Sequence, residues 1–498
     1  MKKARKYFAI LLALVMALTA FPLSGLTTFA ANSGDFTYEV LSETDRICEI
    51  SGYNGEATEL IIPSELDEYT VTSIGEYAFY SCTSLTSVDI PDSVTSIDGF
   101  SFYNCTALTS ITIPDSVTTI NSYAFTDSGY YNDESIWEDG VLYIGNHCIR
   151  AKENISGAYS IKPGTKTIAA AAFQQCDSLE SITIPDSVTS IGYDAFGICT
   201  SLTSVTIGNG VTSIGDSAFS VCDSLTNITV ATNNPNYSSE NGVLFNKDKT
   251  TLILYPTGKS GAFVIPGSVT SIWDSAFASC SSLTSVDIPD SVTSIGDFAF
   301  KYCSSLTSVD IPNSVTSIGA FAFSNTSIAN LDLPDGLQTI GDRAFAYTPI
   351  ESIRIPDSVT EMVYSFYGSN IQSVEMPDKL VSMAYDFHDT PWYEAQADGS
   401  VYLGKMYYAY KGTASDNTQV VVKDGTLGIS DYAFADQTGL SNVSLPEGLL
   451  EIGDKAFSFC TNLQSITIPG SVTSIGDDAF YSCDSLTSVN IPDSVTSI

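Results

Sequence analysis

Histidine is nearly absent from this chain of 498 residues, which contains only His147 and His388. Nucleophilic catalysis and most transition-metal sites depend on imidazole groups. His147 stands next to Cys148, but neighbouring residues of a strand point to opposite faces, which separates the thiol from the imidazole. The sequence also lacks C-x-x-C and H-E-x-x-H motifs. We therefore predict no catalytic residue, no metal ligand and no cofactor, and we expect a protein that is not an enzyme.

Two short motifs have the composition of known sites without their context. A phosphate-binding loop around Gly258-Lys259-Ser260 would need another glycine at position 253, which is Ile253. Asp127-Ser128-Gly129 has the composition of an aspartic protease loop, but that chemistry needs two carboxylates sharing a proton, and no second loop of this kind follows. Both motifs are better explained as turns.

Basic residues are scarce as well. The chain has 20 Lys and Arg residues against 57 Asp and Glu residues, which gives a net charge of -37. Nucleic acids and anionic membranes attract clusters of Lys and Arg. We therefore expect no nucleic-acid partner, and the simplest role of the acidic charge is to keep an exported protein soluble.

Long apolar runs are missing except at the start of the chain. The basic segment Met1–Lys6 precedes an apolar run from Tyr7 to Phe21, and small residues follow up to Ala31. This order is typical of a secretory signal peptide cleaved near Ala30 or Ala31. A membrane anchor is the alternative, but the run is short for a span of about 20 residues. We predict a secreted or cell-surface protein without membrane insertion after cleavage.

The sequence does contain a repeat that starts near Leu85 and continues to the last residue. A fixed period in the twenties is the signature of a solenoid, and this one lies in the leucine-rich repeat range. One coil buries too little apolar surface to offset the ordering of its backbone, so the coils must stack. Leucines that open successive copies are separated by 23 residues within each group: Leu85 and Leu108; Leu179, Leu202 and Leu225; Leu283 and Leu306; Leu440, Leu463 and Leu486.

Residues 283–305, LTSVDIPDSVTSIGDFAFKYCSS, show the organisation of one copy. Leu283, Val286 and Ile288 form a strand signal with inward apolar side chains, and Ser285 and Asp287 alternate with them on the outer face. The proline that follows ends the strand, because it has no amide to donate. The second half has mixed apolar spacing, which favours a short irregular or helical return.

This pattern resembles the BspA-like (Treponema pallidum-type) leucine-rich repeat family of bacterial surface proteins over roughly residues 36–498. The expected fold is a solenoid of about 23-residue coils with a parallel β-sheet on the concave face and short irregular or helical returns on the convex face. The resemblance also implies adhesion, because members of this family are associated with attachment to matrix proteins and with cell aggregation. Fold alone does not fix activity.

We expect four kinds of segment along the chain: a signal peptide at 1–30, an N-terminal hairpin cap with the first coil at 31–80, a solenoid at 81–498, and three hairpin inserts within it. The inserts cover about 126–165, 230–266 and 390–426, and each has Asp-Gly or Asn-Gly before an apolar strand. The chain stops at Ile498 inside a repeat, so we expect the natural protein to continue.

Cysteine recurs at one position of the repeat, three residues after the phenylalanine. Side chains in a column point the same way, which holds them too far apart for easy disulfide formation. We predict small buried thiols, although an exported protein can form disulfides. The nine members are Cys82, Cys105, Cys176, Cys199, Cys222, Cys280, Cys303, Cys460 and Cys483.

The candidate binding residues are those that break the monotony of the outer strand face. That face carries Ser, Thr, Asn and Asp, and its aspartates could bind calcium, although a solvated face is the simpler explanation. Long charged side chains appear only in two of its coils, and aromatic residues gather in the inserts, where covering a coil would explain them equally well. The candidates are Ser352, Arg354, Ser373, Glu375, Trp137, Tyr143, Trp392, Tyr402 and Tyr407.

These observations predict a monomeric binding protein whose partner is a protein or a glycan, and whose expected role is adhesion to host matrix or mucosal proteins, glycans or other cells. The alternative is a targeting module of a larger exported enzyme with a catalytic domain beyond residue 498. The downstream reading frame distinguishes the two. A structural spacer without a ligand is a third hypothesis.

Overall fold

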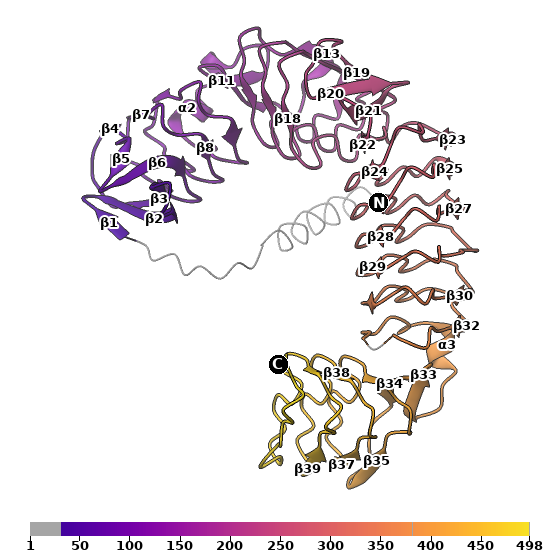
Figure 1. The fold of residues 1–498 in the computed structure, drawn as a ribbon. Helices are drawn as coiled ribbons and strands as arrows, with labels where there is room; N and C mark the ends of the chain where they lie inside the picture. Colours follow the sequence, from indigo (N-terminus) through magenta and orange to yellow (C-terminus); the bar gives the residue numbers. More distant parts are fainter. Residues whose placement is uncertain (1–30, 381, 498) are drawn as a thin grey trace. The chain divides into compact units, whose positions relative to one another are not determined.

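The computed structural model describes residues 31–380 and 382–497, so the predicted signal peptide lies outside the described residues. The chain forms two compact units, Met1–Glu134 and Ser135–Ile498. Both are built from the same coil, and the described part of the chain is a β-solenoid of about 19 turns with almost no helix. The predicted solenoid is confirmed, and Figure 1 shows its coils as successive loops.

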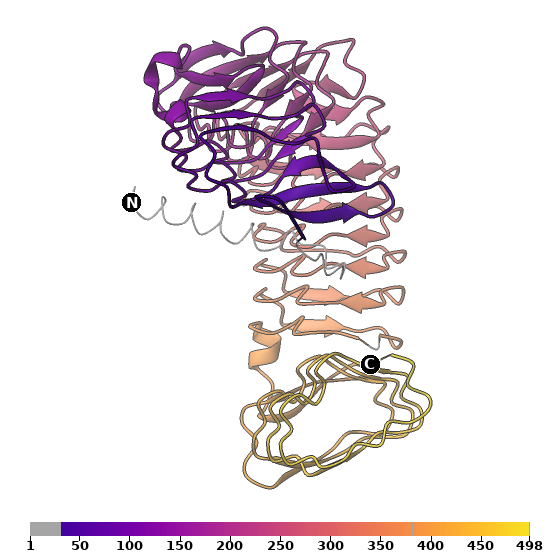
Figure 2. The ribbon, with the colours of Figure 1, turned by 90° about the vertical axis from the view of Figure 1, so that its left-hand side faces the viewer.

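Each regular coil has three sides. In the coil that begins at Leu283, strand β25 (Leu283–Asp287) alternates buried and outward side chains, as predicted from the sequence. Pro289 follows this strand, and the two-residue strand β26 (Ser294–Ile295) forms the second side. A turn through the Ala299-Phe300 pair closes the coil. Coils near the C-terminus are seen end-on as closed loops in Figure 2.

We call the first side the strand face, because its strands pair in parallel from coil to coil. Val286 lies opposite Val309 and Asp287 opposite Asp310. The strands of its separate sheets are β4 (Glu59–Ile61), β7 (Ser87–Asp89) and β9 (Ser110–Thr112); β13 (Ser156–Ser160), β15 (Ser178–Ile184), β17 (Ser204–Ile207) and β19 (Asn227–Val230); β23 (Gly261–Val264), β25 and β27 (Val309–Asp310); β30 (Ser352–Arg354) and β32 (Ser373–Glu375); and β35 (Thr418–Val421), β37 (Leu440–Ser444) and β39 (Ser465–Thr467). Three breaks between separate sheets of this face fall at the inserts, and a fourth, between β27 and β30, falls at a coil around Leu331 and Leu333 that has no strand on this side.

The second side is a ladder of short strands, each contributing one Ser-Ile or similar pair. Ser294 lies opposite Ser271 and Ser317, and the isoleucines pair in the same register. In the first unit these strands are β8 (Ser96–Ile97) and β10 (Thr119–Ile120), and in the second unit β14 (Thr167–Ile168), β16 (Ser190–Ile191), β18 (Ser213–Ile214), β24 (Ser271–Ile272), β26, β28 (Ser317–Ile318), β29 (Thr339–Ile340), β31 (Glu361–Met362), β36 (Gly428–Ile429), β38 (Glu451–Ile452) and β40 (Ser474–Ile475).

The third side, which we call the turn face, is irregular and carries two left-handed residues per coil. Phe298 has φ 57° and Tyr302 has φ 62°, and equivalent residues of neighbouring coils repeat this geometry. A left-handed conformation costs a residue with a side chain about 1 to 2 kcal/mol. Here it aligns backbone groups between coils: the Phe298 N–H donates to Ala320 O, and the Phe300 N–H to Ala322 O, both at 2.7 Å. The return is therefore a third ladder and not a helix.

Two columns of side chains fill the core under the turn face. Phe300 stacks between Phe277 and Phe323, with ring centroids 4.6 and 5.0 Å apart. Cys303 is fully buried, and its thiol donates to the backbone oxygen of Phe277 at 3.1 Å. Cys303 and the other cysteines of the column are free thiols and form no disulfide bonds with one another. Apart from the half-buried Cys82, the cysteine column therefore consists of small buried groups, as predicted, and it also supplies hydrogen bonds between coils.

The first unit begins with an antiparallel hairpin. Strand β1 (Ala31–Ser33) pairs with β2 (Phe36–Ser42), which pairs with β3 (Ile47–Tyr53). Strand β3 then runs parallel to β6 (Tyr69–Ile74), whose other partners are the short β5 (Glu65–Leu66) and the ladder strand β8. The hairpin expected from the alternating residues is thus joined directly to the first coils. The unit ends near α2 (Gly129–Asn132), followed by the 3-10 turn Glu134–Ile136.

Each of the three inserts contains the predicted hairpin. The hairpins are β11 (Val141–Ile144) with β12 (His147–Ala151), β21 (Val243–Asn246) with β22 (Thr251–Leu254), and β33 (Gly399–Leu403) with β34 (Met406–Lys411). The second insert adds β20 (Tyr237–Glu240), and the third adds α3 (Pro391–Glu394). The second strand of every hairpin pairs in parallel with the next short strand: β12 with β14, β22 with β24 and β34 with β36. Each hairpin therefore continues the ladder of short strands and is part of the solenoid.

The third hairpin lies between two core clusters. Tyr408 belongs to the cluster that extends back to Val243, whereas Tyr407 belongs to the cluster that extends on to Cys483. Because successive side chains of a strand point to opposite faces, strand β34 contributes side chains to both clusters.

Candidate binding surface

The strand face presents outward side chains in register. In the sheet of β13, β15, β17 and β19, Ser181, Ser204 and Asn227 lie side by side, and Thr183, Thr206 and Thr229 form the next row. In the sheet of β25 and β27 the outer row contains Asp287 and Asp310, both exposed. The alternation predicted from the sequence therefore produces an ordered polar surface.

The structure brings four of the predicted site residues together on this face. Strands β30 and β32 pair in register, so that Ser352 lies opposite Ser373 and Arg354 opposite Glu375. All four side chains are exposed. We call these four residues the charged patch.

Arg354 has a second acidic neighbour. Its guanidinium lies 3.0 Å from the Asp335 carboxylate, and the side chains are 53% and 83% exposed. The hydrogen bond to Asp335 raises the pKa of Arg354. An ion pair as exposed as this one contributes little to stability, so a partner could replace it at little cost.

Two of the predicted aromatic residues belong to the core. Tyr143 is 5% exposed, and its hydroxyl lies 3.1 Å from that of Tyr159. Tyr407 is fully buried and stacks on Phe434 with 4.4 Å between ring centroids. Tyr143 packs against Tyr159 within its own insert, and Tyr407 lies in the core of the coils that follow, which explains why these aromatic side chains do not reach the surface.

The other three predicted aromatic residues are half-buried. Lys152 Nζ lies 5.3 Å from the Trp137 ring, and Lys423 Nζ lies 4.1 Å from the Tyr402 ring. Trp392, on α3, packs against Phe387 and Tyr408. The backbone N–H of Trp392 donates to Ile371 O at 2.8 Å, which places α3 beside the coil of β32. The Trp392 side chain thus packs against the core beside the coil of β32, whereas Trp137 belongs to another insert.

Sequence reasoning did not identify an aromatic column on the turn face of the first unit. Phe100 stacks on Tyr77 and Tyr123 at 5.2 Å from each ring, and Tyr80 stacks on Tyr103 at 5.6 Å. The signal was available, because an aromatic residue stands two positions before the column phenylalanine in three successive coils. Stacked rings present edges to solvent and cover the junctions between coils.

A titratable cluster lies beside the third insert. Asp386 takes the place of the usual alanine before the column phenylalanine, and its carboxylate accepts the N–H groups of Ser365 and Ala384 at 2.8 and 3.0 Å. Burial raises the pKa of Asp386 to about 7. His388 Nδ1 lies 3.0 Å from the Tyr408 hydroxyl, and burial lowers the pKa of His388 to about 4. The contact between His388 and Tyr408 links this coil to the hairpin, whereas Asp386 links it to the preceding coil through Ser365.

The recurring aspartates of the turn face act as hydrogen-bond acceptors between coils. Asp274 Oδ1 accepts the Asp297 N–H at 2.8 Å, and Asp297 Oδ1 accepts the Ala320 N–H at 2.6 Å. Asp431 and Asp454 continue the arrangement. Within residues 31–380 and 382–497, no three His, Cys, Asp or Glu side chains gather as metal ligands. In the same residues, no helix has the length and apolar character of a membrane span.

The model of the family described as BspA type Leucine rich repeat region (6 copies) matches residues 53–160, 166–251, 253–372 and 406–498. Together these segments make up more than half of the chain. No curated protein matches the sequence.

Solved structures of bacterial leucine-rich repeat proteins are similar to the chain at low identity. A leucine rich cell surface protein from Faecalibacterium prausnitzii A2-165 is 24% identical, with 93% of this chain and 95% of that chain covered and a TM-score of 0.29. The pneumococcal vaccine antigen PcpA is 19% identical, with 84% and 99% covered and a TM-score of 0.40. The Treponema pallidum leucine-rich repeat protein is 23% identical, with 56% and 91% covered and a TM-score of 0.21.

Proposed function

The chain belongs to the BspA type leucine-rich repeat family, and from this premise we propose that it is a cell-surface adhesion protein that binds a protein or glycan partner through its strand face. The observation that carries this proposal is the charged patch. It places Arg354 and Glu375 on adjacent strands, both exposed, within a face whose other outward side chains are mostly Ser, Thr, Asn and Asp.

The geometry of the face supports recognition of a large partner. Its strands repeat at about 4.8 Å, and their backbone is fixed by pairing to neighbouring coils, so outward side chains are ordered before binding. Preorganised groups lose less freedom on association. The insert helix α3 lies beside the coil of β32 and is fixed to it by a backbone hydrogen bond.

The acidic balance of the chain favours particular partners. A net charge of -37 attracts basic protein surfaces and repels nucleic acids and anionic membranes. An export signal at residues 1–30, as the sequence predicts, would deliver this surface to the outside of the cell.

The test measures binding of the chain from Ala31 onward to matrix proteins, mucins and bacterial cells immobilised on a sensor. We expect a saturable signal for one of them, and a weaker signal for the Arg354→Ala and Glu375→Ala double variant. The matched control, Lys455→Ala with Asp477→Ala, also removes one cation and one anion but changes the turn face. The proposal fails if no surface binds, or if the two double variants bind equally.

A further inference from the structure

Strand β13 has one partner among the described strands. It is the first strand of its sheet and pairs with β15. The Ile161 N–H donates to Thr183 O of the following coil at 3.0 Å. Because backbone groups alternate in direction along a strand, the N–H and C=O groups of Ala158 and Ser160 point to the opposite edge. In a regular coil the preceding strand occupies that edge, as β15 does for β17.

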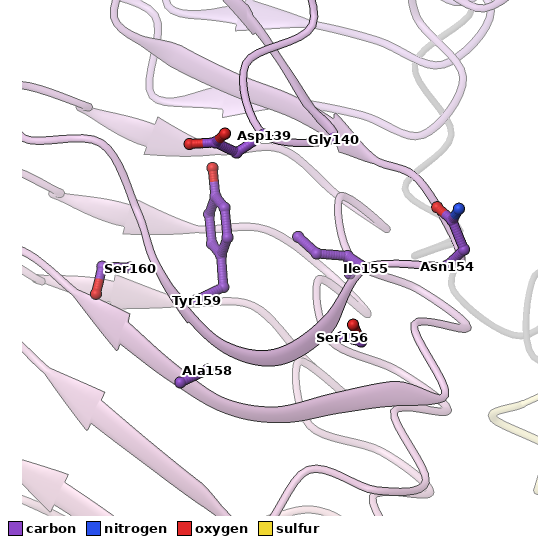
Figure 3. Close-up of a pocket in the computed structure, with 8 residues that line it drawn as sticks. All are labelled: Asp139, Gly140, Asn154, Ile155, Ser156, Ala158, Tyr159 and Ser160. Carbon is purple, nitrogen blue, oxygen red and sulfur yellow. The ribbon is translucent and has the colours of Figure 1, made fainter.

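An open cavity of about 590 Å³ is lined by this strand and the first insert (Figure 3). Ser156, Ala158 and Ser160 line it from β13, and all three are exposed. Asp139 and Asn154 line it from the insert. The edge of β13 is therefore open to a ligand as well as unpaired.

The cavity has an acidic character. Asp139 is exposed, and no Lys or Arg lines the cavity. The neighbouring Glu138 already pairs with Lys162 at 2.6 Å. Figure 3 shows the Tyr159 hydroxyl directed toward the Asp139 carboxylate, and Ile155 provides an apolar wall beside the ring.

We propose that the edge of β13 binds an extended peptide segment of a partner protein, which joins the sheet as an added strand and places a basic side chain against Asp139. This inference rests on the proposed function and names one contact site within it. An exposed strand edge is a template for strand addition, in which main-chain hydrogen bonds give affinity and side-chain pockets give specificity. A peptide backbone matches the two-residue repeat of the free N–H and C=O groups, whereas a glycan has no such repeat.

The second insert provides a matched comparison. Strand β23 begins its sheet in the same way, and Ala262 lies opposite Ser285 just as Ala158 lies opposite Ser181. Both strands have a bulge before the alanine. The turn that precedes the hairpin contains Asn241 in place of Asp139. The edge of β23 therefore lacks the carboxylate that would attract a basic side chain.

The experiment uses fluorescence anisotropy with a labelled eight-residue peptide of alternating valine and lysine. Ala158→Pro removes an N–H that faces the cavity and leaves pairing with β15 intact, because proline is tolerated on edge strands. We expect saturable binding, a loss of about tenfold or more in Ala158→Pro, and unchanged binding in Ala262→Pro. Asp139→Asn should weaken binding and reduce its dependence on salt.

Two further probes identify the mode of binding. The same peptide methylated on alternate backbone nitrogens should lose binding, and a valine–glutamate peptide should bind more weakly. The inference is overturned if the valine–lysine peptide does not bind, if Ala158→Pro and Ala262→Pro lose affinity equally, or if cellohexaose competes for the site. If Ala158→Pro still binds the matrix, mucin or cell partner like the unaltered chain, this inference fails and the proposed function stands.

Discussion

Asp386 shows how a single residue departs from the repeat. Other coils have alanine or serine before the column phenylalanine, whereas this one buries a carboxylate whose pKa is raised from 3.8 to about 7. A buried acid of this kind is protonated in the folded chain at a pH where the unfolded chain is ionised. The contribution of Asp386 to the free energy of unfolding therefore falls as the pH rises from about 4 to 7. It changes no further above the pKa of the folded chain.

Asp386→Asn removes this titration. Relative to the unaltered chain, the variant should gain stability between pH 4 and pH 8, by up to about 4 kcal/mol over the full window. Burial also raises the pKa of Asp431 to about 7. This carboxylate is present in both proteins, so its titration cancels when their stabilities are compared. Denaturant unfolding at pH 4, 6 and 8 measures the difference. A stability difference that does not change with pH would contradict the buried ionisable carboxylate.

The cysteine column makes a second prediction at the residue scale. Ten of the cysteines are buried, Cys82 is half-buried, and burial raises the pKa of Cys303 and Cys460 to about 12. Maleimide reacts with the thiolate, so the folded chain should label slowly and first at Cys82. The unfolded chain should take up 11 labels. Mass spectrometry under non-reducing conditions checks both results, and a missing pair of labels would reveal a disulfide instead.

At the scale of elements, the third hairpin separates two neighbouring residues into different cores. Tyr407 stacks on Phe434 in the C-terminal cluster, whereas Tyr408 lies in the preceding cluster. Tyr407→Ala should cost about 3 to 5 kcal/mol and accelerate amide exchange mainly in residues 418–480. Tyr408→Ala should accelerate exchange mainly in residues 298–387. Hydrogen-exchange mass spectrometry distinguishes these outcomes, and identical exchange patterns would show that the hairpin does not divide the core.

Much of this element-scale structure was predictable. The 23-residue spacing identified the coil, the alternation around Leu283 identified the inward side chains, and Asp-Gly or Asn-Gly located the three hairpins. The left-handed residues of the turn face were not predictable, because Phe298 and Tyr302 have no intrinsic preference for positive φ and adopt it to bond adjacent coils.

The candidate site was predictable in part for a similar reason. The charged patch was found because strand register follows directly from the repeat. The burial of Tyr143 and Tyr407 was missed, because the sequence does not show which side chains of a hairpin face the core. The open edge of β13 was also missed, because the sequence does not reveal which strand an insert leaves without a partner.

At the scale of the whole molecule, stability and recognition have the same origin. Each coil buries its Leu, Val, Ile and Phe side chains against the adjacent coils, and this stacking aligns the outward residues of the strand face. In such arrays stability is approximately a sum over repeats and their interfaces. The central claim is that partners meet the strand face and its open edges, and not the turn face.

Hydroxyl-radical footprinting of the chain with and without its bound partner tests this claim most directly. The strand face has reporters in Ile61, Val264 and Val421, which are 78%, 67% and 76% exposed. The turn face has Tyr347 and Tyr481, which are 54% and 55% exposed. We predict that the partner lowers oxidation of at least one strand-face reporter and leaves both tyrosines unchanged. Protection of the tyrosines with unaltered oxidation of Ile61, Val264 and Val421 would contradict the account.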